Sequence, residues 1–312
     1  MKLIIYIPAY NEEGNIQNVI RSLPKLLDKI DVIDCLVVDD GSTDKTVELA
    51  LAEGAAVIRH KKNKGVGEAF YSASQFALEN GADILVGIDA DGQFNPNEIP
   101  NLIRPILSHQ ADMVIGNRFD SGLPKNMPRI KYWGNLQISK LLSIICGQKF
   151  HDVSCGYRAY SRDVLLWLNL HGAFTYTHET IISSVYEGKY VAETPISVRY
   201  DPERNSRVAK SIFRYAIKTS IIIFRVLLDY QPIRVFGTIG SFLILIGMGF
   251  VAFLLGHYFL TSAFTPYKAY GFIGLGFIIF GMLVFLLALI ADMVKRVRVN
   301  QARMLYEIRK LK

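Results

Sequence analysis

The sequence has 312 residues, of which 51% are hydrophobic, and a formal net charge of +7 at pH 7. Its mean hydropathy of +0.24 is high for a soluble protein and indicates membrane-embedded segments. Three scattered cysteines exclude a disulfide framework and the paired spacing of a zinc site, and they suit a reducing cytoplasm. Because the positive charge gathers around the apolar C-terminal third, we expect a membrane partner and no nucleic acid.

The first part of the chain alternates short apolar runs with helical patterns, which is typical of an α/β fold with a parallel or mostly parallel sheet. Its first run lacks the charged region and cleavage site of a signal peptide, so we expect a strand there. The predicted strands cover residues 3–7, 36–38, 56–58, 84–88 and 113–115, and the predicted helices cover 14–27, 43–53, 67–80 and 96–108.

Two carboxylates, Asp89 and Asp91, directly follow the fourth predicted strand. Two like charges this close repel each other, and one of them takes up a proton unless a cation lies between them. Carboxylate oxygens suit Mg²⁺ or Mn²⁺, so this pair predicts a metal site. The alternative is an ordinary turn, since Asp91-Gly92 is a common turn dipeptide.

Polar residues also follow the other predicted strands, where ligands bind in open α/β sheets. Asp39 and Asp40 follow the second strand and are placed to accept hydrogen bonds from a nucleobase or a ribose. Lysines follow the third strand, and Lys64 is the best candidate to face a phosphate, the alternative being a solvated charge. A nicotinamide site is excluded because Phe70 stands where the third glycine of a dinucleotide fingerprint belongs.

Residues 235–255 and 270–291 contain no charged side chain, and each stretch is long enough to cross a bilayer. They predict two transmembrane helices in a hairpin, with two buried core helices as the alternative. Most flanking cations lie outside the hairpin, so the positive-inside rule places both termini and the α/β part in the cytoplasm. These cations are Arg225, Arg234, Lys295, Arg296 and Arg298, while the linker holds Lys268 and His257.

The sequence thus predicts four parts. Residues 1–206 form the α/β domain, and residues 207–232 form an amphipathic helix in the headgroup plane, because its cations recur at helical spacing. Residues 233–292 hold the two spans, and 293–312 form a basic tail that is interfacial or mediates oligomer contacts. A solvated charged helix is the alternative for 207–232.

Five motifs occur in order along the chain: PAYNEEGNI from Pro8, VVDDGSTD from Val37, IDADGQF from Ile88, GNRF from Gly116 and DVSCGYRAYSR from Asp152. With the hairpin, they make the chain similar to glycosyltransferase family 2, and within it to the polyprenyl-phosphate glycosyltransferases related to dolichol-phosphate mannose synthase. Processive polysaccharide synthases share the early motifs but carry a Gln-x-x-Arg-Trp motif, which is absent here.

The resemblance implies a GT-A fold, with a Rossmann-like sheet, and a hexosyltransferase that inverts the transferred sugar. The donor would be GDP-mannose, UDP-glucose or UDP-N-acetylglucosamine, and the acceptor a dolichyl or undecaprenyl phosphate at the cytoplasmic face of the cell or endoplasmic reticulum membrane. By resemblance, Mg²⁺ or Mn²⁺ would be held by Asp89, Asp91 and Gln93. The nucleotide would be bound by Pro8, Ala9, Tyr10, Glu12, Asp39 or Asp40, Lys64, Asp89, Ala90 and Asp91.

The acceptor phosphate needs cations to orient it. The candidates are Arg118, Arg129, Lys131 and Arg207, each of which has a surface ion pair as its alternative. Asp91 and Asp152 are the candidate catalytic residues; Asp152 would orient the acceptor or act as a base, or would only pair with Arg158. Glu179 is placed to bond sugar hydroxyls.

Three other functions remain open on the sequence: transfer to a lipid acceptor without a phosphate, such as a diacylglycerol, transport of a sugar lipid, and an inactive membrane scaffold. Two spans are few for a transport path, but they allow a homo-oligomer.

Overall fold

In the computed structural model of this chain, the described residues are 1–168, 176–200, 228 and 231–311. The chain divides into two compact units. The first consists of Met1–Ile223 together with Leu305–Lys312, and the second is Phe224–Met304.

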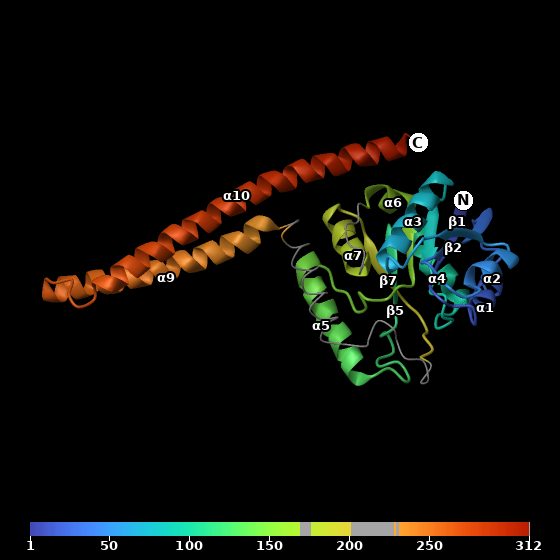
Figure 1. The fold of residues 1–312 in the computed structure, drawn as a ribbon, viewed down its shortest axis with the longest axis horizontal. Coiled ribbons are helices and arrows are strands. Elements are labelled where there is room, and N and C mark those ends of the chain that lie inside the picture. The colour runs from blue at the N-terminus through green and yellow to red at the C-terminus, as the bar shows by residue number, and fades with distance from the viewer. Residues whose placement is uncertain (169–175, 201–227, 229–230, 312) are drawn as a thin grey trace. The chain divides into compact units, whose positions relative to one another are not determined.

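A sheet forms the centre of the first unit (Figure 1). It has seven strands in the order β3-β2-β1-β4-β6-β5-β7. Only β6 runs antiparallel to its neighbours among the described pairings, so the sheet is mostly parallel, as predicted. The strands are β1 (Lys2–Ala9), β2 (Val32–Asp39), β3 (Ala56–Arg59), β4 (Ile84–Gly87), β5 (Met113–Asn117), β6 (Arg158–Ser161) and β7 (Val191–Pro195).

Helices connect these strands in the alternating order that the sequence predicts. The first is shorter than expected and ends at Arg21, because Pro24 disfavours the helical conformation of the residue before it. The helices are α1 (Ile16–Arg21), α2 (Thr46–Ala52), α3 (Val66–Glu79), the 3-10 turn η1 (Pro96–Glu98), α4 (Ile99–Leu107), α5 (Arg129–Cys146), α6 (Arg162–Trp167) and α7 (Tyr176–Tyr186).

The core lies around β1 and β4, most of whose residues are apolar and buried. Helix α3 packs on β1, where the Phe70 ring lies 5.8 Å from that of Tyr6 and stacks on Tyr176 at 4.5 Å. Gly87 allows this packing, because a Cβ there would lie 2.4 Å from the Tyr6 ring. Burying such aromatic rings is a large share of the free energy that holds a domain together.

The carboxyl ends of β1, β2 and β4 meet at one edge of the sheet, which we call the carboxyl edge. Ala9 is paired with Asp39, and the next residue, Asp40, donates its N–H to the Ala9 carbonyl at 2.8 Å. Strand β5 points the same way, because β6 lies antiparallel to both β4 and β5. The polar residues that follow these four strands are therefore brought to the same edge.

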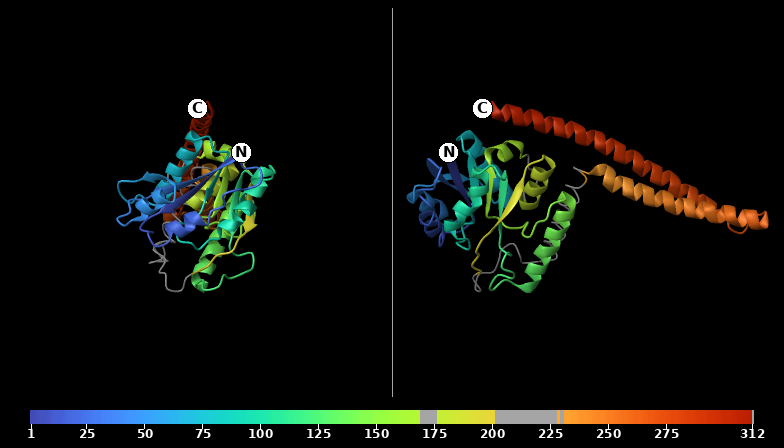
Figure 2. Two further views of the ribbon diagram at one scale, coloured as in Figure 1. Left: turned by 90° about the vertical axis from the view of Figure 1, so that its right-hand side faces the viewer. Right: turned by 180° about the vertical axis from the view of Figure 1, so that it is seen from behind.

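The second unit contains α9 (Pro232–Thr261) and most of α10 (Lys268–Lys310), which lie side by side (Figures 1 and 2). Both helices are long and apolar enough to cross a membrane, and they contain the predicted spans. The helices approach closely through glycines: a Cβ on Gly247 would lie 2.5 Å from the Gly274 carbonyl oxygen, and one on Gly240 would lie 2.9 Å from that of Gly281. Small residues permit this kind of contact between membrane helices.

Helix α10 continues without a break through the predicted basic tail, because no glycine or proline interrupts the sequence after the apolar stretch. Its last residues belong to the first unit. Tyr306 stacks on Trp167 at 4.6 Å, and Arg309 donates hydrogen bonds to the carbonyls of Leu166 and Leu168. The predicted amphipathic helix, residues 207–232, lies almost entirely outside the described residues, as does Arg207.

Candidate functional site

The predicted metal residues lie at the carboxyl edge, immediately after β4. The Asp89 carboxylate packs against Gly156, where a Cβ would lie 3.4 Å from Oδ1. The backbone N–H of Gln93 donates to Asp91 Oδ1 at 3.1 Å, and its carbonyl accepts from the Arg199 N–H at 2.9 Å. These bonds fix the turn that carries both carboxylates.

The pKa of Asp89 is raised from 3.8 to about 7, first because the carboxyl is buried and then because Asp91 is negatively charged. Glu12 adds to the increase, and Arg118 opposes it. A divalent cation would relieve this excess of negative charge. In the described part of the chain, no three His, Cys, Asp or Glu side chains are arranged as a metal site. Two carboxylates with further oxygens from a diphosphate and water suit Mg²⁺, which is commonly bound in this way.

The loops after β1 and β2, which carry predicted nucleotide residues, are hydrogen-bonded to each other. The Asn11 N–H donates to Ser42 Oγ, and the Thr43 N–H donates to Asn11 Oδ1, both at 2.8 Å. The Glu12 N–H donates to Thr46 Oγ1 at 2.8 Å. Asn11 takes a positive φ of 53°, a conformation that asparagine tolerates better than most residues.

The neighbours Asp39 and Asp40 have different partners, although both are buried. Asp39 accepts from the Ser42 N–H at 3.2 Å and lies 3.4 Å from Arg59 Nε. Asp40 accepts shorter hydrogen bonds from the N–H groups of residues 64 and 65 and from His60. The structure therefore separates two carboxylates that the sequence left interchangeable.

Arg118 follows β5 and pairs with Asp152, which is completely buried. Its guanidinium donates to the carboxylate from Nε at 2.6 Å and from Nη2 at 2.8 Å, and Nη1 donates to the Tyr200 hydroxyl at 3.2 Å. Asp152 therefore does not pair with Arg158, the alternative partner in the sequence. This geometry favours an anchoring role for Asp152 rather than that of a general base.

Arg158, which the sequence offered only as an alternative partner of Asp152, organises the loop before β6. Its buried side chain donates to the carbonyls of Val153, Cys155 and Thr177 and to the Thr180 hydroxyl, at 2.6–3.0 Å. An unexpected residue, Glu193 on β7, accepts the N–H of Asp152 at 2.9 Å. Arg158 stands in the motif that begins at Asp152, but no local sequence signal marks Glu193, because its partner lies on another segment.

The remaining predicted acceptor residues are on or near α5. Lys131 is half-buried, with its ammonium 5.3 Å from the centre of the Tyr200 ring. The pKa of Lys131 is lowered, first by burial and then by the positive charge of Arg118, while Asp91 and Asp152 oppose the decrease. Arg129 is exposed at the first position of α5. Lys131 is thus close enough to Asp91 and Asp152 for their charges to act on its ammonium.

Two other predicted residues are less constrained by their surroundings. Lys64 has an exposed side chain, and its backbone is held by Asp40. Glu179 lies in the first turn of α7 and is partly buried. Neither position tests the predicted contact with a phosphate or a sugar.

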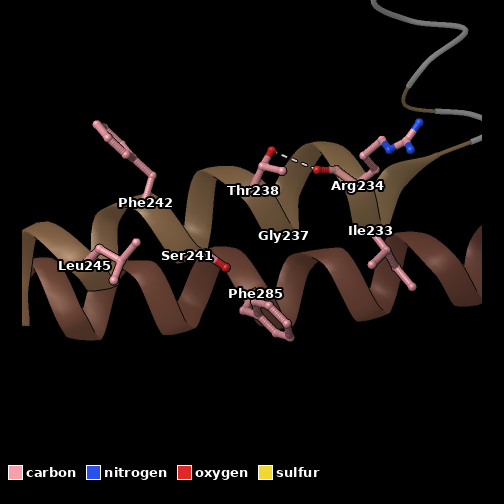
Figure 3. Close-up of a pocket in the computed structure, with 8 residues that line it drawn as sticks. All are labelled: Ile233, Arg234, Gly237, Thr238, Ser241, Phe242, Leu245 and Phe285. Atoms are coloured by element: carbon pink, nitrogen blue, oxygen red, sulfur yellow. Dashed lines mark hydrogen bonds between the residues drawn. The ribbon is translucent and has the colours of Figure 1, made fainter. Parts of the chain in front are cut away.

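A shallow groove lies on the second unit, along α9 and against Phe285 of α10 (Figure 3). Its lining is mostly apolar, with Arg234 as its charged member and a hydrogen bond from Thr238 to the Arg234 carbonyl. It contains no carboxylate, so we assign the chemistry to the carboxyl edge of the first unit.

Comparison with known proteins gives consistent results. The model of the family described as glycosyl transferase family 2 matches residues 4–167. The chain is 36% identical, over 53% of its length and 71% of the relative's, to a UDP-N-acetylglucosamine–dolichyl-phosphate N-acetylglucosaminyltransferase of Methanococcus voltae. It is 32% identical, over 63% and 83% of the two lengths, to an undecaprenyl-phosphate mannosyltransferase of Micrococcus luteus. Glucosyl-3-phosphoglycerate synthase of Mycobacterium tuberculosis shares the fold, with a TM-score of 0.55 and 24% identity over 72% of this chain and 79% of that one.

Proposed function

This chain belongs to glycosyl transferase family 2 and is a glycosyltransferase with a GT-A fold, and we propose that it transfers one sugar from a nucleotide sugar to a polyprenyl phosphate. The names of its relatives support this reaction, since they are transferases that use dolichyl or undecaprenyl phosphate. The proposed donor is GDP-mannose, UDP-glucose or UDP-N-acetylglucosamine, and the proposed acceptor is a dolichyl or undecaprenyl phosphate.

The observation that carries the proposal is the arrangement of opposite charges at the carboxyl edge. Asp89 and Asp91 supply the negative charges, and Arg118 and Lys131 supply the positive ones. Arg118 interacts electrostatically with Asp89, and Lys131 interacts with Asp91. One phosphate-bearing ligand can approach the acidic pair through a cation, and another can approach the half-buried Lys131, while Arg118 is bonded to Asp152. A transferase that joins a nucleotide sugar to a lipid phosphate needs both kinds of contact.

In the proposed reaction, an oxygen of the lipid phosphate attacks the anomeric carbon of the sugar. A new bond forms between this carbon and that oxygen, and the bond from the carbon to the diphosphate breaks. The nucleoside diphosphate leaves with the electron pair of the broken bond, and the configuration at the anomeric carbon is inverted. A phosphomonoester has its second pKa at about 6, so the attacking oxygen is largely ionised at neutral pH and needs no base.

Asp89, Asp91 and Gln93 are the proposed ligands of a divalent cation, Mg²⁺ or Mn²⁺, which would neutralise the leaving diphosphate. Residues 8–12 with Asp39 would contact the nucleoside. Lys131 would bind the acceptor phosphate, and Arg118 would hold the adjacent surface in place through Asp152. Asp152 is proposed to hold the Arg118 guanidinium in place rather than to act as a general base.

We propose that α9 and α10 anchor the enzyme in the membrane that contains its lipid acceptor. The positive-inside rule supports a cytoplasmic first unit, because Lys295, Arg296 and Arg298 follow the second apolar stretch. A scaffold without activity is disfavoured, since it would have no need of the acidic pair.

The test is transfer from radiolabelled GDP- and UDP-sugars to polyprenyl phosphate by the full chain in detergent, with Mg²⁺ or with EDTA. The proposal expects label in the lipid phase with a particular donor and its loss with EDTA. No lipid label with any donor, from protein that is folded and binds nucleotide, would overturn the proposed acceptor.

A further inference from the structure

Three side chains form a hydrogen-bonded chain that joins the ends of β2 and β3 to helix α3. His60, which is only 7% exposed, has Nδ1 at 2.8 Å from Asp40 Oδ1 and Nε2 at 2.9 Å from Ser72 Oγ. In the tautomer whose Nδ1–H donates to the carboxylate, Nε2 accepts the Ser72 hydroxyl. The imidazole is thus held at both nitrogens, and it holds Asp40 in turn.

The Asp40 carboxylate is used to hold the backbone of the loop that follows β3, residues 61–65. It accepts the Lys64 N–H at 2.9 Å and the Gly65 N–H at 2.8 Å, in addition to the bond from His60. A carboxylate has about four acceptor positions. Three of them are therefore occupied within the protein, which makes Asp40 a support of this loop.

The loop also touches the β2–α2 connection directly. Gly41 has a positive φ of 82°, and a Cβ there would lie 2.9 Å from the carbonyl carbon of Lys62. The His60 N–H donates to the Asp39 carbonyl at 2.8 Å. Residues 61–65 are therefore held against the Asp39–Asp40 segment from several directions, at the edge where the nucleotide is proposed to bind.

We propose that His60 and Ser72 are positioning residues for the donor nucleotide. They fix the Asp40 carboxylate, which orders residues 61–65 so that this loop is already in place when the nucleotide arrives. This inference rests on the proposed function, because it assumes a nucleoside diphosphate at the carboxyl edge. An ordered loop strengthens binding because the conformational entropy of ordering is not lost at the binding step.

The two nitrogens of His60 can be separated by substitution. Asparagine places an N–H donor at the Nδ1 position and keeps the contact to Asp40, whereas glutamine reaches toward the Nε2 position and Ser72. The proposal therefore expects His60→Asn to bind nucleotide better than His60→Gln, although glutamine is closer to histidine in volume. A role in core packing alone would favour the opposite order.

The experiment measures binding of UDP and GDP, with Mg²⁺, to the full chain in detergent by calorimetry. For the nucleotide that the wild type binds, we expect His60→Ala to raise Kd about tenfold, the effect of losing one hydrogen bond to a charged group. Ser72→Ala should raise Kd about threefold, since it removes a neutral partner one step further away. The matched control is Ser74→Ala, also on α3, whose hydroxyl bonds only its own helix at the Phe70 carbonyl among the described contacts, and it should bind like the wild type.

Limited trypsin digestion reports on the loop itself, because residues 61, 62 and 64 are exposed lysines. Without nucleotide, cleavage after these lysines should be faster in His60→Ala than in the wild type and unchanged in Ser74→Ala. Ser72→Ala and His60→Asn keep the test decisive if His60→Ala does not fold.

The possible results are distinguishable. If the wild type binds neither nucleotide, the proposed function fails and the inference fails with it. If the wild type binds a nucleotide and both His60→Ala and Ser72→Ala bind it with the same Kd as the wild type, the inference alone is overturned. Weaker binding without faster cleavage of the loop would also overturn it, because the loss would then have another cause.

Discussion

The guanidinium of Arg118 donates two parallel hydrogen bonds to the carboxylate of Asp152, although the residues lie 34 positions apart in the sequence. The Asp152 side chain is 0% exposed and that of Arg118 is 9% exposed. The pKa of Arg118 is raised by its partner, although burial alone would lower it. A buried pair of this kind fixes the geometry of its surroundings, because either charge alone would be costly to bury.

The first prediction concerns this pair. Asp152→Ala should lower the apparent melting temperature by about 6–12 °C, because leaving one charge of a buried pair unpartnered costs about 3 kcal/mol or more. The double variant with Arg118→Ala should lose clearly less than the sum of the single losses, as thermal unfolding in detergent would show. If the two single losses in melting temperature simply add in the double variant, the two side chains do not act as a pair. The control is Asp120→Ala, at an exposed loop position, which should melt like the wild type.

The second prediction concerns the acidic pair. Asp91→Ala should lower the rate of sugar transfer by about a hundredfold or more, since a metal at this position supplies several kcal/mol of charge stabilisation. Initial rates at saturating Mg²⁺ and donor measure this loss, and Asp120→Ala should transfer at the wild-type rate. An Asp91→Ala variant that keeps most of its activity would remove the acidic pair from the chemistry.

The third prediction concerns Lys131. Lys131→Ala should raise KM for the polyprenyl phosphate about tenfold and leave KM for the donor nearly unchanged, because a charged hydrogen bond to the acceptor is lost. Lys140→Ala is the matched control, since Lys140 is exposed on the same helix. A rise in KM for the donor instead would place Lys131 on the nucleotide side of the site.

Lys131 also predicts a pH dependence. Because burial and Arg118 lower the pKa of its ammonium, Lys131 loses its proton at a lower pH than an ordinary lysine, whose pKa is 10.5. As the pH rises, KM for the acceptor should therefore begin to increase at a lower pH than it would if Lys131 had the pKa of an ordinary lysine. Lys131→Arg should remove this alkaline increase, because arginine stays protonated. Identical pH profiles for the two proteins would contradict the assignment.

The fourth prediction concerns Asp163, which forms an ion pair with Lys189 and accepts a hydrogen bond from Tyr306 at 2.7 Å. Partial burial would raise the pKa of Asp163, but these bonds outweigh it and lower the pKa below 3.8. The carboxylate thus stabilises the fold above the ordinary aspartate pKa, and this contribution disappears as the pH falls through the lowered value. Asp163→Asn should lower the melting temperature near neutral pH and have little effect in acid, as a pH series of thermal scans would show. An equal loss at every pH would mean that the charge is not involved.

Several features of the site could be predicted from local sequence. Asp89 and Asp91 stand out because aspartates rarely end an apolar strand, and the structure places them at the edge where parallel strands end. The same rule applied to the third strand would have drawn attention to His60, which directly follows β3. The apolar stretches in α9 and α10 are recognisable by length and composition alone.

The partners within the site could not be predicted in this way. Whether Asp152 meets Arg118 or Arg158 depends on how β5 and β6 pair, and no property of the loop sequence decides it. Strands β6 and β7 were not expected, since their sequences, RAYS and VAETP, are short and partly polar. Both strands are specified by pairing with β5, which is a tertiary effect.

The central claim is that the acceptor is a lipid phosphate, and the most direct test compares acceptors with the donor that the enzyme accepts. Undecaprenyl phosphate, undecaprenol and diacylglycerol are each supplied in detergent with Mg²⁺ and the labelled nucleotide sugar. The account predicts labelled product with undecaprenyl phosphate alone, and loss of that product in Lys131→Ala at low acceptor concentration. Label in undecaprenol or diacylglycerol, at a rate equal to that with the phosphate, would contradict it.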